Sequence, residues 1–216
     1  MSMPGAEPAD RADGRMLVER LLAGDERVFT DLVQAWSPGM LRLARTFVSS
    51  PQAAEDVVQE AWLGVLQGLH LFQGRSSLRT WALTIVVNRA KTRGVRDSRT
   101  TPGYEPAEAV GATVDAGRFQ GRDGRYPGGW TSAGVPHPWQ QPDGNVIARE
   151  TQQLLGQALD RLPPRQRAVV ILRDVQGCDS TEVCAIMGVT PANQRDLLHR
   201  GRAGLRAVLE DYYRSP

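Results

Sequence analysis

The sequence contains few of the residues that build metal sites and disulfide frameworks. Two cysteines occur in 216 residues, Cys178 and Cys184, and neither belongs to a CxxC pair or has a neighbouring histidine. This pattern excludes a disulfide-stapled fold and a zinc site built on cysteine pairs, and it fits a reducing cytoplasm. We therefore expect a cytoplasmic protein that binds no metal and needs no cofactor.

Long apolar runs are also missing. No stretch approaches the roughly 20 consecutive apolar residues that cross a bilayer. Residues 1–14 are small and polar, unlike a secretion signal. Strand-like alternation of polar and apolar residues does not persist anywhere, and no internal repeat is found. We predict an all-α protein without membrane insertion, whose first 14 residues form a disordered tail.

The residue patterns of common enzyme classes are absent as well. The sequence shows no carboxylates clustered with histidine, no glycine-rich phosphate loop before a helix and no nucleophile motif. The three histidines, His70, His137 and His199, are scattered along the chain. An enzyme that acts on nucleic acid is an alternative, but we predict a protein that is not an enzyme.

Two helical segments flank a segment rich in glycine and proline. Apolar residues recur at helical spacing in residues 15–99 and again in residues 145–216, whereas residues 100–144 show no sustained periodicity. A chain of this length can hold two small domains. The expected architecture is two small helical domains joined by a long linker at residues 100–144.

The first domain is predicted to be a bundle of helices with apolar stripes. Its clearest helix starts after Ser50, which can cap it, and Pro51 takes the first position, where no backbone donor is missed. A preceding helix is expected to break at residues 37–39, the sequence Ser-Pro-Gly. The apolar positions expected in the core include Met16, Leu17, Leu21 and Leu22 near the start, and Ala54, Val57, Val58, Ala61, Trp62, Val65, Leu66 and Leu69 after Ser50.

The opposite face of the helix after Ser50 is polar, with one apolar residue in it. Asp56, Gln59 and Glu60 lie around Leu63 on this face. A single exposed leucine is ordinary and needs no explanation. The alternative is a docking surface with an apolar centre and an acidic rim, and the pattern alone favours the ordinary leucine.

Positive charge is concentrated in two segments. Residues 75–99 contain seven Arg or Lys and one acid, and residues 188–208 contain four Arg and one acid. Arg89 and Arg93 lie four positions apart and share a helix face, so an anion such as phosphate would relieve their repulsion. The two segments are either solvated helix faces or two contacts with a polyanion.

The second domain has the pattern of a helix-turn-helix motif. Asp179 with Glu182 resembles a capping box for a short helix, Gly188 marks a turn, and Thr190 can cap the last helix. In such motifs the early residues of the second helix reach base edges, and we expect later basic residues to contact phosphates. The early residues are Asn193, Gln194 and Arg195, and the later basic residues are Arg200 and Arg202.

Five stretches, in the same order and in both domains, resemble the sigma-70 family, in particular its extracytoplasmic-function group. They are residues 54–62 (AEDVVQEAW), 72–81 (FQGRSSLRTW), 85–89 (IVVNR), 159–167 (LDRLPPRQR) and 198–202 (LHRGR). The resemblance implies a sigma factor that binds core RNA polymerase and directs promoter-specific transcription initiation. Such a factor recognises −10 and −35 promoter elements and assists promoter melting.

The resemblance also implies roles for individual residues. The face around Leu63 would grip the clamp helices of the polymerase's largest subunit, which favours the docking interpretation. The loop after Phe72, with Asn88, would capture a flipped base near −10, and the helix-turn-helix would read the −35 duplex. The implied core polymerase contacts are Asp56, Gln59, Glu60 and Leu63; the −10 contacts are Phe72, Gln73, Gly74, Arg75, Ser76, Asn88, Arg89, Lys91, Arg93 and Arg96; and the −35 contacts are Asn193, Gln194, Arg195, His199, Arg200 and Arg202.

The sequence departs from the family pattern in two respects. Gln194 stands where many relatives have an apolar residue and Leu197 where many have a basic one, so the identity of the −35 sequence is open. The linker is also longer than expected for the group, and it is either a disordered tether or a partly ordered path on the polymerase.

We expect no fused sensor domain, which leaves room for a separate anti-sigma factor.

A helix-turn-helix repressor or activator that acts without joining polymerase is the main alternative. It would account for the second domain but not for the motifs of the first. Co-purification with core polymerase would separate the two hypotheses, because only a sigma factor requires it.

Overall fold

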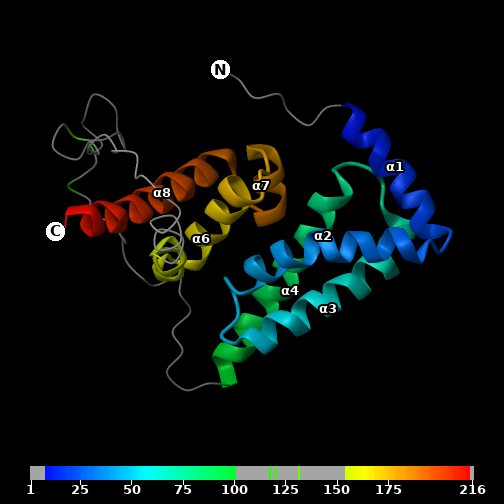
Figure 1. Ribbon diagram of the computed structural model, residues 1–216, viewed down its shortest axis with the longest axis horizontal. Coiled ribbons are helices and arrows are strands. Elements are labelled where there is room, and N and C mark those ends of the chain that lie inside the picture. Colours follow the sequence, from blue (N-terminus) through cyan, green and yellow to red (C-terminus); the bar gives the residue numbers. More distant parts are fainter. Residues whose placement is uncertain (1–7, 101–116, 118–119, 121–130, 132–153, 215–216) are drawn as a thin grey trace. The chain divides into compact units, whose positions relative to one another are not determined.

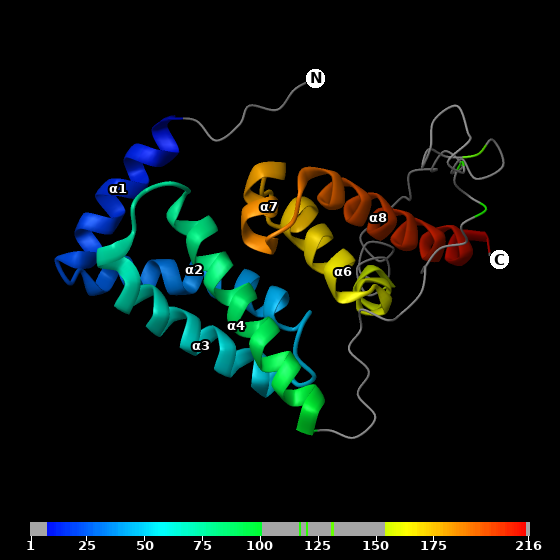
Figure 2. The same cartoon turned by 180° about the vertical axis from the view of Figure 1, so that it is seen from behind.

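The structure, a computed structural model, describes residues 8–100 and 154–214 together with the single residues 117, 120 and 131. Every regular element in these ranges is a helix, which confirms the predicted fold class (Figures 1 and 2). The chain divides into two compact units, one of residues 1–106 and 168–195 and one of residues 107–167 and 196–216. Most of the predicted linker at 100–144 lies outside the described residues.

The first helical segment consists of four α-helices and one short turn of 3-10 helix. The elements are α1 (Pro8–Leu22), α2 (Glu26–Ala44), α3 (Pro51–Gly68), η1 (Leu69–Leu71) and α4 (Leu78–Thr100). Helix α1 starts at Pro8, so residues 8–14, which the sequence assigns to a disordered tail, are helical. This extension matters below, because the start of α1 lines a pocket.

Local hydrogen bonds fix where α2 and α3 begin. The Asp25 carboxylate accepts a bond of 3.1 Å from the Val28 amide, and this bond, with the one from Arg20, lowers the pKa of Asp25. The Ser50 hydroxyl accepts a bond of 3.1 Å from the Ala53 amide, with Pro51 at the first position of α3. The predicted start of this helix is therefore confirmed.

Helix α2 continues through Pro38, so the predicted break at residues 37–39 is wrong. A proline inside a helix removes one backbone bond and costs about 3 kcal/mol. Met40 and Leu43, in the turn that follows, are fully buried, and their burial offsets this cost. The Ser37 hydroxyl also accepts a bond of 3.0 Å from the indole nitrogen of Trp62 on α3. Packing on both sides of Pro38 thus keeps the helix in one piece.

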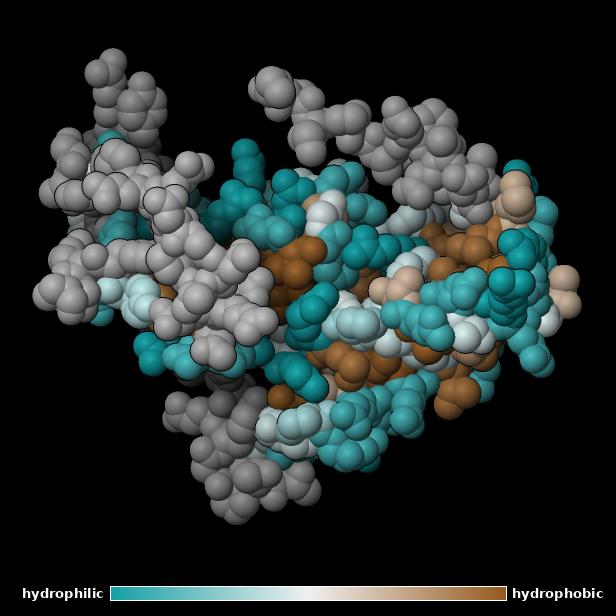
Figure 3. Space-filling model, viewed as in Figure 1, coloured by the Kyte–Doolittle hydropathy of each residue, from teal (hydrophilic) through white to brown (hydrophobic). Residues whose placement is uncertain are grey.

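Contacts between helices decide which apolar residues are buried. Met16, Leu22 and Leu66 are predicted in the core, but the structure exposes all three. In α1 the buried residues are Val18 and Leu21, because the helix contacts its neighbours along the face that carries them. On the face drawn in Figure 3, apolar patches consequently lie among hydrophilic surface over α1 to α4.

The second helical segment contains the predicted helix-turn-helix. Residues 154–161 are helical and are followed by α6 (Pro164–Val170), the π-helical turn η4 (Ile171–Val175), α7 (Ser180–Met187) and α8 (Pro191–Arg214). The Asp179 carboxylate accepts from the Glu182 amide at 2.8 Å, and the Glu182 carboxylate accepts from the Asp179 amide at 2.9 Å, which confirms the capping box. Gly188 ends α7 in the left-handed conformation (φ 67°), which glycine adopts without strain.

Candidate nucleic-acid interface

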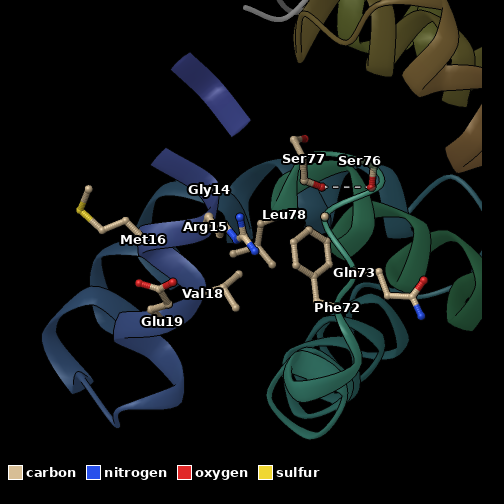
Figure 4. A pocket seen from close by; sticks show the side chains of 11 residues that line it. Gly14, Arg15, Met16, Val18, Glu19, Phe72, Gln73, Ser76, Ser77 and Leu78 are labelled. Carbon is tan, nitrogen blue, oxygen red and sulfur yellow. Dashed lines mark hydrogen bonds between the residues drawn. The ribbon is translucent and has the colours of Figure 1, made fainter. Parts of the chain in front are cut away.

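A pocket of about 1040 Å³ lies where the loop between η1 and α4 meets α1 (Figure 4). The loop runs from Phe72 to Ser77 and turns at Gly74, whose φ of 67° favours glycine. The residues that line the pocket are Gly14, Arg15, Met16, Val18 and Glu19 from α1, and Phe72, Gln73, Gly74, Ser76, Ser77 and Leu78 from the loop and the start of α4. Of the five residues of this stretch predicted to bind the −10 element, four line the pocket: Phe72, Gln73, Gly74 and Ser76. The fifth, Arg75, is exposed and does not line it.

The pocket combines an aromatic ring with hydrogen-bonding groups. The Phe72 ring centroid lies 5.3 Å from that of Trp81 at an interplanar angle of 50°, which holds Phe72 in place. The Ser76 hydroxyl donates to the Ser77 carbonyl at 3.3 Å (dashed in Figure 4), while the side chain of Gln73 is exposed. An aromatic face beside polar groups suits a nucleobase, which has both a flat face and a hydrogen-bonding edge.

The basic residues of α4 line a second, smaller cavity of about 400 Å³. Its lining residues are Val57, Glu60, Ile85, Asn88, Arg89, Thr92, Arg93 and Arg96. At a rise of about 1.5 Å per residue, Asn88 lies roughly 16 Å along the helix from Ser77. Asn88 lines this cavity and the loop lines the other, so a base held by both stays a prediction.

Acidic residues of α3 pair with the basic residues of this cavity. Arg89 lies 3.1 Å from Glu60, and Arg93 lies 3.8 Å from Asp56 and 3.1 Å from Asp97. The chain itself thus supplies negative charge to the arginines that share a helix face. All of these side chains remain partly exposed, so an incoming phosphate could compete for the guanidinium groups.

Lys91 lies in a different environment from the arginines of α4. Its side chain is only partly exposed, its ammonium donates to the Met187 carbonyl at 3.0 Å, and it lies 5.9 Å from the centroid of the Phe47 ring. Lys91 therefore contacts a backbone carbonyl and an aromatic ring, whereas Arg89 and Arg93 pair with carboxylates.

The outward face of α3 is more apolar than the sequence suggests. Leu63 is 58% exposed and Leu66 is 42% exposed, three positions apart on the same helix. Gln59 and Glu60 are exposed beside them, and Asp56 is partly exposed. We call Asp56, Gln59, Glu60, Leu63 and Leu66 the α3 surface. A pair of exposed leucines with an acidic rim fits a protein partner better than one exposed leucine does.

The helix-turn-helix presents two of the three residues predicted to read bases. Asn193 and Arg195 are exposed at the start of α8, whereas Gln194 is only 1% exposed. The side-chain amide oxygen (Oε1) of Gln194 accepts a bond of 2.9 Å from the Ser180 hydroxyl of α7, so the Gln194 side chain points into the motif. Gln194 occupies the position where many relatives have an apolar residue, and its prediction as a base-reading residue does not fit this burial.

Three further residues of α8 were predicted at the −35 element. Arg200 is exposed and pairs with Asp196 at 3.0 Å, one turn earlier on the helix. Arg202 is exposed and His199 is partly exposed. Each of these three side chains is therefore at least partly exposed and could contact DNA.

Two kinds of site are not found in the described part of the chain. No three His, Cys, Asp or Glu side chains lie close enough there to hold a metal ion. None of the helices that the structure describes has the length and apolar character to cross a membrane.

Sequence reasoning missed the contribution of α1 to the pocket. Arg15 and Glu19 line it, although the sequence assigns this segment only to the core stripe. Arg15 and Glu19 are four positions apart, so the sequence could have indicated that they share one helix face. What the sequence could not show is that this face meets the loop after η1.

Comparisons with known proteins identify the two helical segments. The family model described as Sigma-70 region 2 matches residues 32–100, and the one described as Sigma-70, region 4 matches residues 152–205. Together they cover more than half of the chain. The chain is similar to the ECF RNA polymerase sigma-E factor of Escherichia coli (strain K12), with 27% identity over 197 residues, 91% of this chain and 94% of that protein.

Solved structures share the fold. The structure of CnrH in complex with the cytosolic domain of CnrY has a TM-score of 0.56 at 19% identity and covers 92% of this chain and 97% of its own. The sigma factor RpoE of Bartonella quintana, in complex with the anti-sigma factor NepR, has a TM-score of 0.55 at 20% identity and covers 84% of this chain and 96% of its own. These likenesses agree with the helical architecture described above.

Proposed function

This chain belongs to the sigma-70 family of RNA polymerase sigma factors, in the extracytoplasmic-function group, and on that premise we propose how its residues divide promoter recognition. Promoter-specific transcription initiation needs a contact with core polymerase and contacts with promoter DNA. We assign these to three surfaces: the α3 surface, the pocket with the basic face of α4, and the start of α8. The polymerase supplies the chemistry, and the chain works in the cytoplasm, where promoters are transcribed.

The α3 surface is proposed to bind the clamp helices of the polymerase's largest subunit. Its support is the exposed pair Leu63 and Leu66 next to Asp56, Gln59 and Glu60. Removing two leucines from water favours association, and the acidic rim favours a basic partner and fixes its orientation.

The pocket at the loop is proposed to capture one base that leaves the −10 duplex. Extruding a base costs a few kcal/mol, because pairing and stacking are lost. Stacking on an aromatic side chain offsets about 1–3 kcal/mol of this cost per base, and hydrogen bonds to the loop offset a further part. Phe72 supplies the aromatic face, while Gln73 and Ser76 supply polar groups. This pocket is the observation that carries the −10 assignment.

The basic cavity of α4 is proposed to follow the strand next to the captured base. Asn88, Arg89, Arg93 and Arg96 line it, and none of them lines the loop pocket, so this cavity would hold a different part of the strand. The pairs with Glu60 and Asp56 are partly exposed and weak, so strand phosphates can replace the carboxylates. Arg75 and Lys91 stay predicted contacts of the same strand: Arg75 is exposed, and Lys91 would exchange its bond to the Met187 carbonyl for a phosphate.

The start of α8 is proposed to read the −35 duplex. Asn193 and Arg195 are exposed at positions that reach base edges in helix-turn-helix proteins, and Arg200, Arg202 and His199 lie further along the helix, where phosphates are contacted. Gln194 is left out of the base contacts because it is buried. Its role is to join α7 to α8 through Ser180.

A separate anti-sigma factor is proposed as a further partner. The sigma factor from Bartonella quintana that shares this fold was solved in complex with an anti-sigma factor. An inhibitor that covered the exposed leucines of the α3 surface would compete with polymerase for the same apolar area. Competition between core polymerase and such a protein for wild type, together with weaker binding of both partners by Leu63→Ala, would support this arrangement.

Promoter opening tests the proposed −10 site. Holoenzyme assembled with Gln73→Ala should form closed complexes normally but fewer open complexes, seen as lower permanganate reactivity of −10 thymines. The defect should shrink on a template already mismatched through the −10 region, because the cost of opening is then largely removed. Gln34→Ala, an exposed glutamine of α2 outside the pocket, is the matched control. Normal melting by Gln73→Ala would remove the loop from the proposal.

A further inference from the structure

Helix α1 supplies one side of the loop pocket, and this side carries a positive charge. Arg15 is exposed and extends from α1 toward Leu78 and the ring of Phe72 (Figure 4). Among the side chains that the structure describes, none forms an ion pair with Arg15. The next arginine of α1, Arg20, is held by Asp25 at 2.7 Å. Arg15 therefore brings a guanidinium group, which has no ion-pair partner among the described side chains, to a pocket that also offers an aromatic face.

Buried contacts fix the position of Arg15 relative to the loop. Val18 and Leu21 of α1 belong to one buried cluster with Leu69 of η1 and Leu78 of α4. Val18 follows Arg15 by three positions, so the two side chains lie on neighbouring parts of one helix face. Because apolar burial holds α1 against the start of α4, the backbone of Arg15 is held beside the pocket, within reach of its side chain.

We infer that Arg15 reads the base that enters the pocket and is a specificity-determining residue for the −10 element, an inference that rests on the proposed function of the loop. A base stacked on Phe72 presents its edge to the rest of the pocket, where the guanidinium group of Arg15 lies. Guanidinium is a planar fork of donors without an acceptor. It therefore pairs best with an edge that has two adjacent acceptors, as guanine (O6 and N7) and cytosine (O2 and N3) have, and adenine and thymine do not.

The test measures binding of single-stranded −10 oligonucleotides by holoenzyme, with one position at a time made abasic. At the position that enters the pocket, Arg15→Ala should weaken binding of the intact strand about tenfold, as for the loss of one paired base contact. It should leave binding of the abasic strand unchanged, because the group that Arg15 contacts is then missing. Replacing guanine or cytosine at this position by adenine or thymine should weaken wild type but not Arg15→Ala.

Two further variants separate base reading from a general effect of charge. Arg15→Lys keeps the charge but loses the planar fork, so it should bind as weakly as Arg15→Ala. Arg20→Ala removes a positive charge from the same helix outside the pocket and should bind like wild type. Melting temperatures of the variants should match that of wild type, because Arg15 is exposed and Arg20 forms only an exposed ion pair.

Each contrary outcome has a defined meaning. Equal weakening of intact and abasic strands by Arg15→Ala, or normal binding by Arg15→Lys, would show that Arg15 acts as a charge on phosphate, and the inference would be wrong. Normal binding by Arg15→Ala alongside weakened binding by Gln73→Ala would overturn the inference but leave the proposed −10 site in place. Normal binding by both variants would overturn the proposed −10 site as well.

Discussion

The Nη1 atom of Arg89 lies 3.1 Å from the Oε2 atom of Glu60, so one ion pair joins the surface proposed for polymerase to the surface proposed for the −10 strand. Arg93 and Asp56 repeat the connection at 3.8 Å, one turn later on α4 and one turn earlier on α3. Each acid on the rim of the α3 surface is therefore also a counter-charge for an arginine of α4. A partner that engaged Glu60 and Asp56 would leave Arg89 and Arg93 freer to bind phosphate.

Reversing the acids of the α3 surface should abolish association with core polymerase. Asp56→Arg combined with Glu60→Arg places like charges against a basic partner, which typically costs several kcal/mol at a desolvated contact. The reversal also sets arginines beside Arg89 and Arg93, so the neutral variant Asp56→Asn with Glu60→Gln belongs in the same experiment and should bind with reduced affinity. Binding is measured by pull-down and by fluorescence anisotropy.

The matched control reverses two exposed acids of another helix. Glu26→Arg with Asp31→Arg makes the same change of charge on α2, outside the α3 surface, and should bind core polymerase like wild type. Helicity should change little in both α3 variants, and melting should change least in Asp56→Asn with Glu60→Gln, which loses only partly exposed ion pairs worth up to about 1 kcal/mol each. Undiminished binding by Asp56→Arg with Glu60→Arg would show that the α3 surface does not bind core polymerase.

Arg195 and Arg202 should differ in how they affect the −35 duplex. Arg195→Ala should weaken the best sequence by about 1–3 kcal/mol and relax the preference at one base pair, because a base contact is lost. Arg202→Ala should weaken all sequences alike and lower the salt dependence, as expected for a phosphate contact. Holoenzyme binding to a library of −35 variants at several salt concentrations measures both effects. An unchanged preference with Arg195→Ala would contradict the base contact.

Gln194→Leu should leave the −35 preference unchanged. The Gln194 side chain is buried and bonds to Ser180, and its amide nitrogen is buried without a hydrogen-bond partner among the described residues. Replacing it by an apolar residue of similar size removes this unsatisfied donor, so we expect no large loss of stability. The same −35 library provides the measurement. A loss of base preference with Gln194→Leu as large as the loss with Arg195→Ala would show that Gln194 also contacts a base.

Gly94→Ala should destabilise the first helical segment. A Cβ atom at this position of α4 would overlap the carbonyl oxygen of Phe47, just after α2, and backbone cannot move aside without disturbing the core. Overpacking of this kind costs about 1–3 kcal/mol. Gly156→Ala is the matched control, because nothing lies within 4 Å of a Cβ there, and the helix should gain about 0.5–1 kcal/mol. Urea denaturation followed by circular dichroism measures both.

Cys178 should be unreactive in the folded protein. Burial, with the nearby Glu182 carboxylate adding to it, raises the pKa of its thiol from 9.0 to about 11. At pH 8 iodoacetamide should therefore alkylate Cys184, which is partly exposed, much faster than Cys178. Mass spectrometry of the labelled peptides measures the two rates, and comparable rates would contradict the burial of Cys178.

The same pKa gives a direction for stability at high pH. Below pH 9 the Cys178 thiol is protonated in both folded and unfolded chains. Between pH 9 and about 11 the unfolded chain ionises first, so the free energy of unfolding should fall across this window. Cys178→Ala should lack this part of the fall, which urea denaturation at a series of pH values can measure.

The sequence by itself determined the features that depend on neighbouring residues. The caps at Ser50 and Asp179 are satisfied by side chains and amides within three positions, so their hydrogen bonds could be read from local spacing. Helical periodicity likewise indicated an all-α chain, and motifs in both segments indicated the family. Leu63 could be placed on the outward face of α3 for the same reason, because the helix period alone fixes that face.

Only the tertiary structure decided features that depend on residues far apart in the chain. Helix α2 passes through Pro38 because the next turn is buried against other helices, which no local rule shows. The Gln194 side chain is buried against Ser180, and Asn88 lines a different cavity from the loop. Arg15 meets the loop because buried apolar contacts hold α1 against η1 and α4. For Pro38, Gln194 and Arg15 the deciding factor is contact with an element distant in the chain, and a sequence pattern gives the face of a helix but not its neighbour.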